Sequence, residues 1–476
     1  MTRAANCQPQ RSLLGKGSKR GSKRVLGLGL VLGLAGAFLA VAPAAGQSLE
    51  ESLATAYTTN PSLLAARARL KAVNEGVPQE LSNWRPRVTV NASAGKQRTE
   101  SEGTFGSGTQ NTTPLTAELG VTQSLYRGGR TVAGTKRAEA AVLAERQVLT
   151  SVEQDVLLNA ATAYMDVWRD QSVLQLNVSN ERVLQRQLEA SRDRFEVGEI
   201  TRTDVAQSEA RLARATAERI AAEGDLTASR AVFQEVVGLY PRLLEEPPAL
   251  EGLPASQDEV IAAAAAAQPD LVSAKFTEQA ARHQVRVSLG ELFPEVSLNG
   301  EIGYDEETST EDSNTESYRI LAQVTVPLYQ QGLVSSRVRE DKQIANQRRI
   351  EIDQAGRAAE QNAISAWEDL QTARAQIVSF QSQVDSTRIA LEGVRQENEV
   401  GARTILDILD AEQEFLDAQV SLVRARRDVS VAGYAVLAAM GRLIAGNLGL
   451  PVAVYDPVKD YKAVRDKWFG LSIPED

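Results

Sequence analysis

The sequence is poor in the residues that most enzymes and metal proteins use for chemistry. Among its 476 residues it has one cysteine, Cys7, and one histidine, His283. It has no ligand cluster with metal-binding spacing, no nucleophile motif and no phosphate loop, because Gly128 and Gly129 lack the further glycines of a dinucleotide fingerprint. We therefore expect no cofactor, no metal and no catalytic residues, and an enzyme is the least favoured class of function.

Most of the chain also lacks long hydrophobic runs, and the chain has no net positive charge. After residue 46 no apolar stretch approaches the ~18 residues that a membrane-spanning helix needs. The net charge is −10, and a chain this acidic is a poor binder of nucleic acid. Aromatic residues make up only 5% of the sequence. The remaining apolar content is weighted toward alanine, which favours long helices that pack closely.

The first 46 residues have the layout of a secretory signal peptide. A basic segment that ends at Arg24 precedes a short apolar segment, 25–41, and the small residues of 42–46 offer cleavage sites. Because Cys7 lies in this segment, the mature protein is predicted to have no thiol. Residues 1–46 are therefore set aside from the fold argument.

The most informative feature that is present is an internal duplication. The segment Val-Gly-Glu-Ile-Thr-Arg-Thr-Asp-Val at 197–205 returns as Val-Gly-Ala-Arg-Thr-Ile-Leu-Asp-Ile at 400–408, which is 203 residues later. Upstream of Gly95 the copies are instead related by 208 residues. A repeat of this length indicates two copies of one supersecondary unit. We assign 47–243 to the first repeat, 250–445 to the second and 446–476 to a C-terminal tail.

Each copy is predicted to contain one very long helix and one returning helix. No proline occurs between residues 115 and 240 or between 328 and 450, and both tracts are rich in helix formers. The stretch from Gly129 to about Phe195 alone spans roughly 100 Å at ~1.5 Å per residue. Tight turns are expected at Gly198 and Gly401, each followed by a Thr-x-x-Asp capping box that opens the returning helix.

A different pattern lies upstream of each long helix. Four segments of about ten residues alternate apolar and polar side chains, which is the length and period of strands in a membrane β-barrel. Their apolar series run from Val88 to Ala94, Ala117 to Val121, Val296 to Ile302 and Ile320 to Val326. We expect a polar loop between the strands of each pair, and the second loop, 305–316, is rich in acidic residues.

Aromatic side chains lie at the helix-side ends of these strands: Trp84, Tyr126, Phe293 and Tyr329. Because aromatic girdles mark the interfaces of membrane barrels, we predict that the four residues lie at one face of a membrane. Four strands cannot close a barrel, and an open sheet edge is not tolerated in lipid. The chain must therefore oligomerise. A trimer with twelve strands leaves a channel, whereas a dimer with eight strands is filled by side chains.

Together these features resemble the TolC-type outer membrane efflux proteins of Gram-negative bacteria, over about residues 48–443 and most specifically at 195–205 and 400–410. The resemblance implies a mainly α fold with a small β part. Long duplicated hairpins of three chains would form a periplasmic α-barrel, and four strands per chain a twelve-stranded outer membrane β-barrel. It also implies a homotrimer in outer membrane lipid, with a long periplasmic extension that meets a periplasmic adaptor and an inner-membrane pump or ABC exporter.

The resemblance further implies residues for the periplasmic entrance. Asp407 and Asp410 match a pair of pore-facing aspartates, and crowding of such carboxylates in a trimer should raise the pKa of some of them. The positions that match a network holding the entrance closed are Arg403, Asp204, Gln187 and Thr203. The chain departs from the family pattern at Asn398 and Arg395, so this network is expected to be wired differently.

The turn residues also have simpler interpretations. Asp204 and Asp407 fit as capping residues of the returning helices. Asp410 has no capping role, which makes it the better candidate for the pore. Gly198 and Gly401 are required by the turns, and their predicted position at the tips also makes them expected contacts of the adaptor.

Two other classes of function stay open. A soluble periplasmic coiled-coil adaptor or scaffold explains the helices, but it leaves the four strands and the aromatic residues beside them without a role. An enzyme explains none of these features. For a channel, the sequence leaves the cargo open between drugs, secreted proteins, polysaccharides and metal ions.

Overall fold

The structure is a computed structural model that describes residues 47–104, 106–248, 250 and 252–473. The predicted signal peptide, 1–46, lies outside the described residues. The helices of the first repeat are α1 (Leu49–Thr59), α2 (Pro61–Asn74), α3 (Gly76–Leu81), the short 3₁₀ helix η1 (Ser82–Trp84), α4 (Arg130–Glu196) and α5 (Arg202–Val237). Those that follow are α6 (Gln257–Ala267), α7 (Pro269–Gly290), α8 (Leu333–Glu399), α9 (Ile405–Ala439) and α10 (Pro457–Arg465). The strands are β1 (Arg87–Ala94), β2 (Gln97–Gly103), β3 (Gly106–Thr112), β4 (Leu115–Arg127), β5 (Glu295–Glu306) and β6 (Asn314–Thr325).

The duplication read from the sequence is repeated in the fold. Helices α4 and α8 are each 67 residues long and begin 203 residues apart. In the sheet, Val90 pairs with Leu119, and Leu298 pairs with Ala322. These two pairs are related by the same shifts of 208 and 203 residues. The predicted pair of long helical hairpins is therefore confirmed.

Local sequence accounts for where these helices begin and end. The predicted interruptions occur at Asn60 and Gln268, whose side chains cap the helices that open with Pro61 and Pro269. Proline is favoured in the first helical turn because its missing N–H has no partner there in any case. Helix α5 ends at Gly238, which has a φ of +86°, a conformation that favours glycine.

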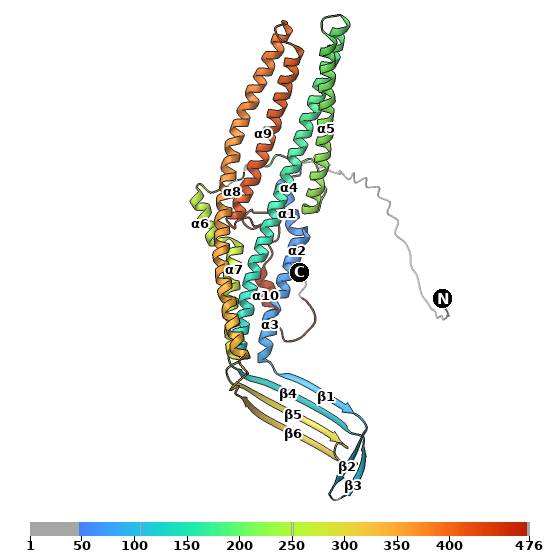
Figure 1. The fold of residues 1–476 in the computed structure, drawn as a ribbon, viewed down its shortest axis with the longest axis vertical. Coiled ribbons are helices and arrows are strands. Elements are labelled where there is room, and N and C mark those ends of the chain that lie inside the picture. Colours follow the sequence, from blue (N-terminus) through green and yellow to red (C-terminus); the bar gives the residue numbers. More distant parts are fainter. Residues whose placement is uncertain (1–46, 105, 249, 251, 474–476) are drawn as a thin grey trace, which may run out of the picture. The chain divides into compact units, whose positions relative to one another are not determined.

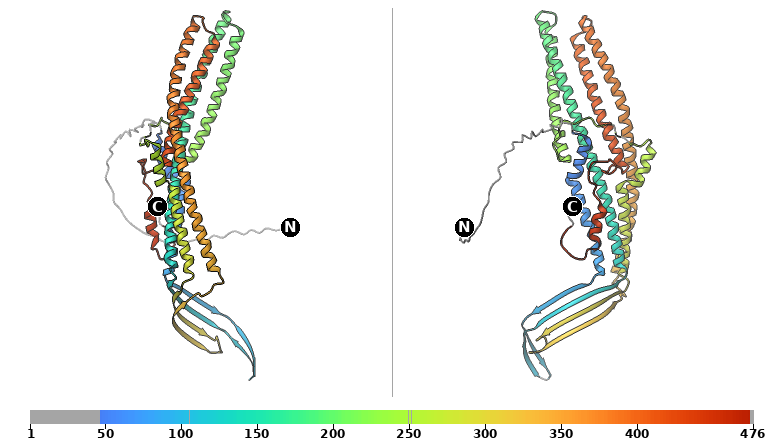
Figure 2. Two further views of the ribbon diagram at one scale, coloured as in Figure 1. Left: turned by 60° about the vertical axis from the view of Figure 1, so that its left-hand side comes forward. Right: turned by 180° about the vertical axis from the view of Figure 1, so that it is seen from behind.

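The helices of the described chain pack side by side as a wall (Figures 1 and 2). Helix α5 packs on α4, α4 on α9 and α9 on α8, and α5 also touches α9 directly. Helix α7 packs against both α4 and α8, and α2 packs on α4. Two adjoining apolar stripes of α4 contribute to the core, with Ala160, Ala161 and Ala163 beside the buried Tyr164. Small side chains on adjoining stripes let α4 contact neighbours on both flanks. Among the described residues, no helix is both long enough and apolar enough to cross a membrane.

The four predicted strands form one antiparallel sheet in the order β1-β4-β5-β6. Because side chains alternate along a strand, the pairing register decides what each face carries. The register aligns Val90, Leu119, Ile302 and Tyr318 on one face, and large apolar residues on this face are exposed. The opposite face is polar and includes a 2.9 Å ion pair between Arg319 and Glu301.

Two details of the sheet differ from the prediction. The first connection, expected to be a loop, contains a further hairpin of β2 and β3, which is polar on both faces and so lacks the alternation that indicates a strand. Gln110 of this hairpin donates a 2.9 Å hydrogen bond to the Ser309 carbonyl of the second connection. That second connection is shorter than expected, because β5 continues to Glu306 and β6 begins at Asn314.

The change from strand to long helix depends on two neighbouring glycines with positive φ. Gly128 has a φ of +60° and Gly129 a φ of +77°. A Cβ on Gly128 would overlap the carbonyl oxygen of Gly290 and lie 2.9 Å from Cβ of Phe293, whereas a Cβ on Gly129 would meet nothing within 4 Å. Only Gly128 is therefore fixed by space as well as by backbone conformation.

This contrast gives a matched pair of variants. Gly129→Ala should lower the free energy of unfolding by about 1–2 kcal/mol, because alanine must then adopt the left-handed conformation. Gly128→Ala should cost that amount plus about 1–3 kcal/mol of overpacking against the α7 end. The measurement is the thermal unfolding temperature of each purified variant, followed by circular dichroism. Equal losses in the two variants would contradict close packing at Gly128.

Candidate functional site

The two hairpins end in turns with the same backbone. Gly198 has a φ of +80° and Gly401 a φ of +78°, and a Cβ on either would meet nothing within 4 Å. Glycine is therefore needed at both positions for its conformation and not for space. Both turns are exposed on the chain and lie at the hairpin ends farthest from the sheet (Figure 1).

Each returning helix opens with the predicted capping box. Asp407 Oδ2 accepts hydrogen bonds from the Thr404 backbone N–H at 2.9 Å and from the Thr404 hydroxyl at 2.8 Å. Asp204 and Thr201 repeat this arrangement with the same distances. The two hydrogen bonds from Thr404, together with the nearby positive charge of Arg403, hold the pKa of Asp407 below its ordinary value. This lowering of the pKa within one chain is opposite in direction to the rise that the sequence predicts for carboxylates crowded together in a trimer.

Arg403 is held within its own hairpin. Its Nε donates a 2.8 Å hydrogen bond to Glu397, and Asn398 Nδ2 donates at 2.8 Å to the Arg403 carbonyl. Asn398 thus stabilises the turn. This hydrogen bond is one consequence of having asparagine at a position where the chain departs from the family pattern. Among the described residues Arg403 and Asp204 do not contact each other. Gln187 is half-buried on α4 and Thr203 is exposed at the start of α5.

Asp410 is the predicted residue that connects the hairpins. Its carboxylate forms an ion pair with Arg211, which projects from α5 of the other hairpin. Beside this pair an apolar cluster also joins the hairpins. Its buried members are Leu184, Ala215, Ile405 and Leu409. Arg211 was missed in the sequence analysis, because no local pattern shows which residue of α5 faces α9.

The two arms of each hairpin are joined by an ion pair at equivalent positions. Arg192 contacts Glu209 at 2.7 Å in the first copy, and Arg395 contacts Glu412 in the second. Glu412 is only 8% exposed, so its charge depends on Arg395 for compensation. The arginine at 395, unusual for the family that the sequence resembles, therefore repeats the pairing found in the first copy.

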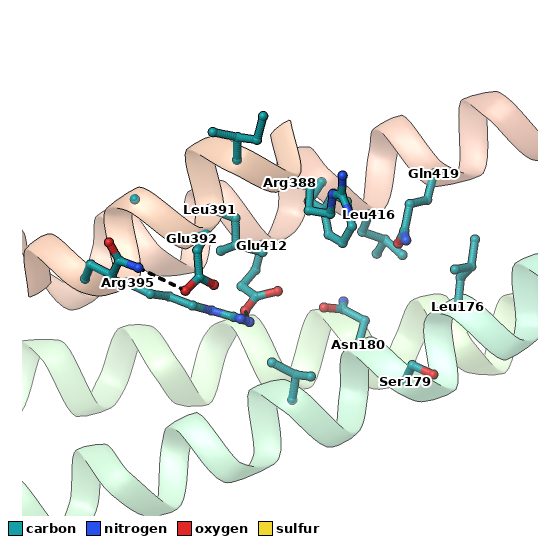
Figure 3. A pocket seen from close by; sticks show the side chains of 15 residues that line it. Leu176, Ser179, Asn180, Arg388, Leu391, Glu392, Arg395, Glu412, Leu416 and Gln419 are labelled. Carbon is teal, nitrogen blue, oxygen red and sulfur yellow. Dashed lines mark hydrogen bonds and ion pairs between the residues drawn. The ribbon is translucent and has the colours of Figure 1, made fainter. Parts of the chain in front are cut away.

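A groove of about 830 Å³ runs between α4 and the second hairpin. Figure 3 shows Asn180 on α4 across the groove from Glu412 and Leu416, with Arg388 and Leu391 on the same side as these two. Asn180 is buried, and its Nδ2 has no hydrogen-bond partner among the described residues. The groove therefore combines an apolar strip with a buried amide donor that has no partner in the described chain.

The four aromatic residues lie where the helices meet the sheet. Trp84 ends η1 just before β1, Tyr126 is near the end of β4, and Phe293 and Tyr329 flank β5 and β6. A bulge between Ser124 and Tyr126 places Tyr126 opposite Val296, on the apolar face. All four rings are exposed. In the described part of the chain, no group of three or more histidine, cysteine or acidic residues is arranged to hold a metal.

Comparisons with known proteins agree on one family. The family model described as outer membrane efflux protein matches residues 53–239 and 260–442. The chain is 36% identical over 447 residues to outer membrane efflux protein BepC of Brucella suis, covering 93% of this chain and 96% of that protein. It is 25% identical to outer membrane protein TolC of Vibrio cholerae, covering 86% and 94%. The Campylobacter jejuni CmeC outer membrane channel matches the fold with a TM-score of 0.76 and 15% identity, covering 88% and 89%.

The capping boxes allow a test of the turn geometry. Thr404→Ala should raise the pKa of Asp407 toward its ordinary 3.8. It should also speed amide exchange in the first turn of α9 about fivefold, the effect of losing an N-cap worth about 1 kcal/mol. Because the folded pKa of Asp407 is lowered, its stabilisation is present at neutral pH and is lost as the pH falls below 3.8 through the folded value. Hydrogen–deuterium exchange at pH 7 is the measurement.

Thr201→Ala is the matched control for this prediction. It should change exchange in the first turn of α5 and leave α9 unaffected. Unchanged exchange at 404–409 in Thr404→Ala would show that the capping box does not hold this turn.

Proposed function

The chain belongs to the outer membrane efflux protein family, and from that premise we propose that three copies form a tunnel through which small molecules leave the cell. It is an outer membrane protein whose long helices extend into the periplasm. One observation carries the proposal. The sheet has one apolar and one polar face, and its edge strands β1 and β6 each pair on only one side within the described chain.

Closure of this sheet explains the trimer. In hydrocarbon every backbone donor and acceptor needs a partner, so β6 of one copy must pair with β1 of the next. Three copies supply twelve strands, and a barrel of this size leaves a channel. The polar face, with Glu301 and Arg319, then lines the channel, while Val90 and Ile320 face lipid. The rings of Trp84 and Tyr126 lie at the level where the barrel leaves the membrane.

The hairpins supply the periplasmic part of the tunnel and its partner sites. Three chains contribute six hairpins, and the turns at Gly198 and Gly401 form the entrance. We assign these turns as contacts for a periplasmic adaptor that connects the tunnel to an inner-membrane transporter. The groove beside Asn180 and Glu412 extends this surface, because its apolar strip suits a helix of the adaptor.

Efflux is favoured over protein secretion because the family model and the 36% identical BepC are both described as outer membrane efflux protein, and we infer small molecules as the cargo from that description. A soluble adaptor or scaffold would have no use for a sheet that exposes an apolar face. The residues that define the proposal serve conduction and gating, and none is assigned a catalytic role.

The link between the hairpins is the proposed gate. Opening of the entrance separates the two hairpins of each chain at their tips. This movement breaks the ion pair between Arg211 and Asp410 and exposes the apolar cluster around Leu409. Asp407 is ionised at neutral pH, since the ordinary pKa of this carboxyl is 3.8 and Thr404 and Arg403 lower it further. Three copies of this carboxylate at the entrance favour cations.

The trimer can be tested by cross-linking across the sheet edges. Leu119 of β4 pairs with Ile302 of β5. Applying the two repeat shifts to this pair places Ala322 of one copy beside Ala94 of the next. The double variant Ala94→Cys/Ala322→Cys should therefore form disulfides between copies and run as a covalent trimer on a non-reducing gel.

Each single variant, Ala94→Cys and Ala322→Cys, is the control and should show no ladder. A ladder that stops at the dimer would contradict the trimer. Full recovery of the mature protein in the soluble periplasmic fraction would contradict the channel itself.

The gate can be tested in planar bilayers. An exposed ion pair contributes about 0.5 kcal/mol, so loss of three pairs should raise the open fraction about tenfold. Arg211→Ala and Asp410→Ala should both raise the resting conductance, and Asp410→Ala should also weaken cation preference. Arg192→Ala is the matched control, because it removes an ion pair within one hairpin. Equal resting currents in Arg211→Ala and Arg192→Ala would contradict a role of Arg211 in gating.

A further inference from the structure

The segment 466–473 exposes large apolar side chains that the tunnel does not use. Trp468, Phe469, Leu471 and Ile473 are all exposed, with Phe469 at 90%. Arg85 stacks over Trp468, and Ile473 lines a pocket beside Ala72 of α2, while Phe469 and Leu471 stay open to solvent on the described chain. A cluster of exposed apolar residues indicates a surface that contacts a membrane, another protein or a ligand.

The position of this segment is fixed at the junction of helices and sheet. Arg85, which follows Trp84 and precedes β1, donates a 2.8 Å hydrogen bond to the Lys467 carbonyl. Its guanidinium lies 4.7 Å from the centroid of the Trp468 ring. The Lys467 ammonium donates a 2.5 Å hydrogen bond to the Ser472 carbonyl, which folds the segment into a loop. The start of the loop is therefore held at the level where β1 begins, while Ile473 at its end lies in a pocket beside Ala68 and Ala72 of α2.

Helix α10 provides a firm base for the loop. Arg465 contacts Glu139 of α4 at 3.3 Å, and Arg146 of α4 lies 5.2 Å from the ring of Tyr461. Val464 is buried against the helices. The loop leaves α10 directly after these contacts, so its apolar side chains project from a fixed point on the wall of helices.

Basic and acidic side chains are nearly balanced over residues 456–476, with four basic and five acidic ones, and the basic ones all lie close to the exposed apolar side chains in the sequence. The basic ones are Lys459, Lys462, Arg465 and Lys467. Basic residues beside exposed aromatic and aliphatic side chains are the composition of segments that lie in a membrane interface.

We propose that the loop 466–473 inserts into the phospholipid leaflet on the helix side of the outer membrane and anchors the wall of helices to it. The inference rests on the proposed function in one respect, because it takes the start of β1 as the membrane surface. Trp468 sits at the headgroups, as tryptophan does in interfacial belts. Phe469 and Leu471 reach the headgroup and acyl boundary, about 5–10 Å deep.

Lipid-selective quenching tests the proposal on the full-length trimer. An environment-sensitive fluorophore is attached at Phe469→Cys or Leu471→Cys, since the mature protein is predicted to have no other thiol. The protein is reconstituted in vesicles of phosphatidylethanolamine and phosphatidylglycerol. Val454→Cys is the matched control, since Val454 is an exposed apolar residue of the same tail beside Tyr455, which contacts Tyr57 of α1. Ile320→Cys on the apolar sheet face reports whether the sheet is in lipid.

The proposal predicts that nitroxide-labelled lipid quenches positions 469 and 471 at least twofold more than 454, while iodide quenches them at least twofold less. Iodide access at 469 and 471 equal to that at 454 would overturn the inference. Protection from both quenchers would also overturn it, because another protein copy would then cover the loop. Ile320→Cys distinguishes failure of the loop proposal from failure of the proposed function. Absence of lipid quenching at position 320 would contradict a sheet in the membrane, and not only insertion of the loop.

Arg85 supplies a second arm of the experiment. Arg85→Ala removes the contacts that hold Lys467 and Trp468, and it should halve the lipid quenching at Phe469→Cys or reduce it further. Arg98→Ala is the control, because Arg98 forms an exposed pair with Glu100 on the β2 hairpin, away from the loop. Quenching that stays unchanged in Arg85→Ala would contradict the placement of the loop by Arg85.

Discussion

The structure depends on one constraint, which is that backbone N–H and C=O groups must be paired wherever water is absent. The helices meet this requirement alone, since each residue pairs along its own chain. The four-stranded sheet does not, because the outer edges of β1 and β6 have no partner in the described chain. A single chain can therefore pair the backbone groups of its helices in water, but it cannot pair those at the edges of its sheet in lipid.

This difference assigns rigidity and movement to opposite ends of the molecule. A closed ring of strands has no edge to open without exposing backbone groups to lipid. Near their tips the hairpins are joined by side-chain contacts, which include the cluster around Ile405 and Leu409 and the ion pair of Arg211 with Asp410. Water replaces an ion pair at little cost. A gate is therefore compatible with the turns, and the sheet is suited to remain permanently closed.

Sequence reasoning succeeded where the determining signal is local or repeated. The helix starts at Thr201 and Thr404 and the alternation of the four strands depend on neighbouring residues, and the repeat shift confirmed each in a second copy. It failed where the signal is absent or distant. Strands β2 and β3 are polar on both faces, so no alternation marks them. The partner of Asp410 depends on how α5 and α9 align, and only packing between helices determines that register.

The most informative difference between the copies follows from the same repeat shift. Within a chain, Arg211 of the first hairpin meets Asp410 of the second. In a ring of six hairpins, the equivalent positions at the boundary between chains are Glu414 and Gln207 of the next copy. A carboxylate and an amide form no ion pair, so this boundary has no charge pair at the corresponding point. In the proposed ring, the charge pair at this point therefore lies within each chain and has no counterpart at the boundary between chains, although the two boundaries derive from one ancestral unit.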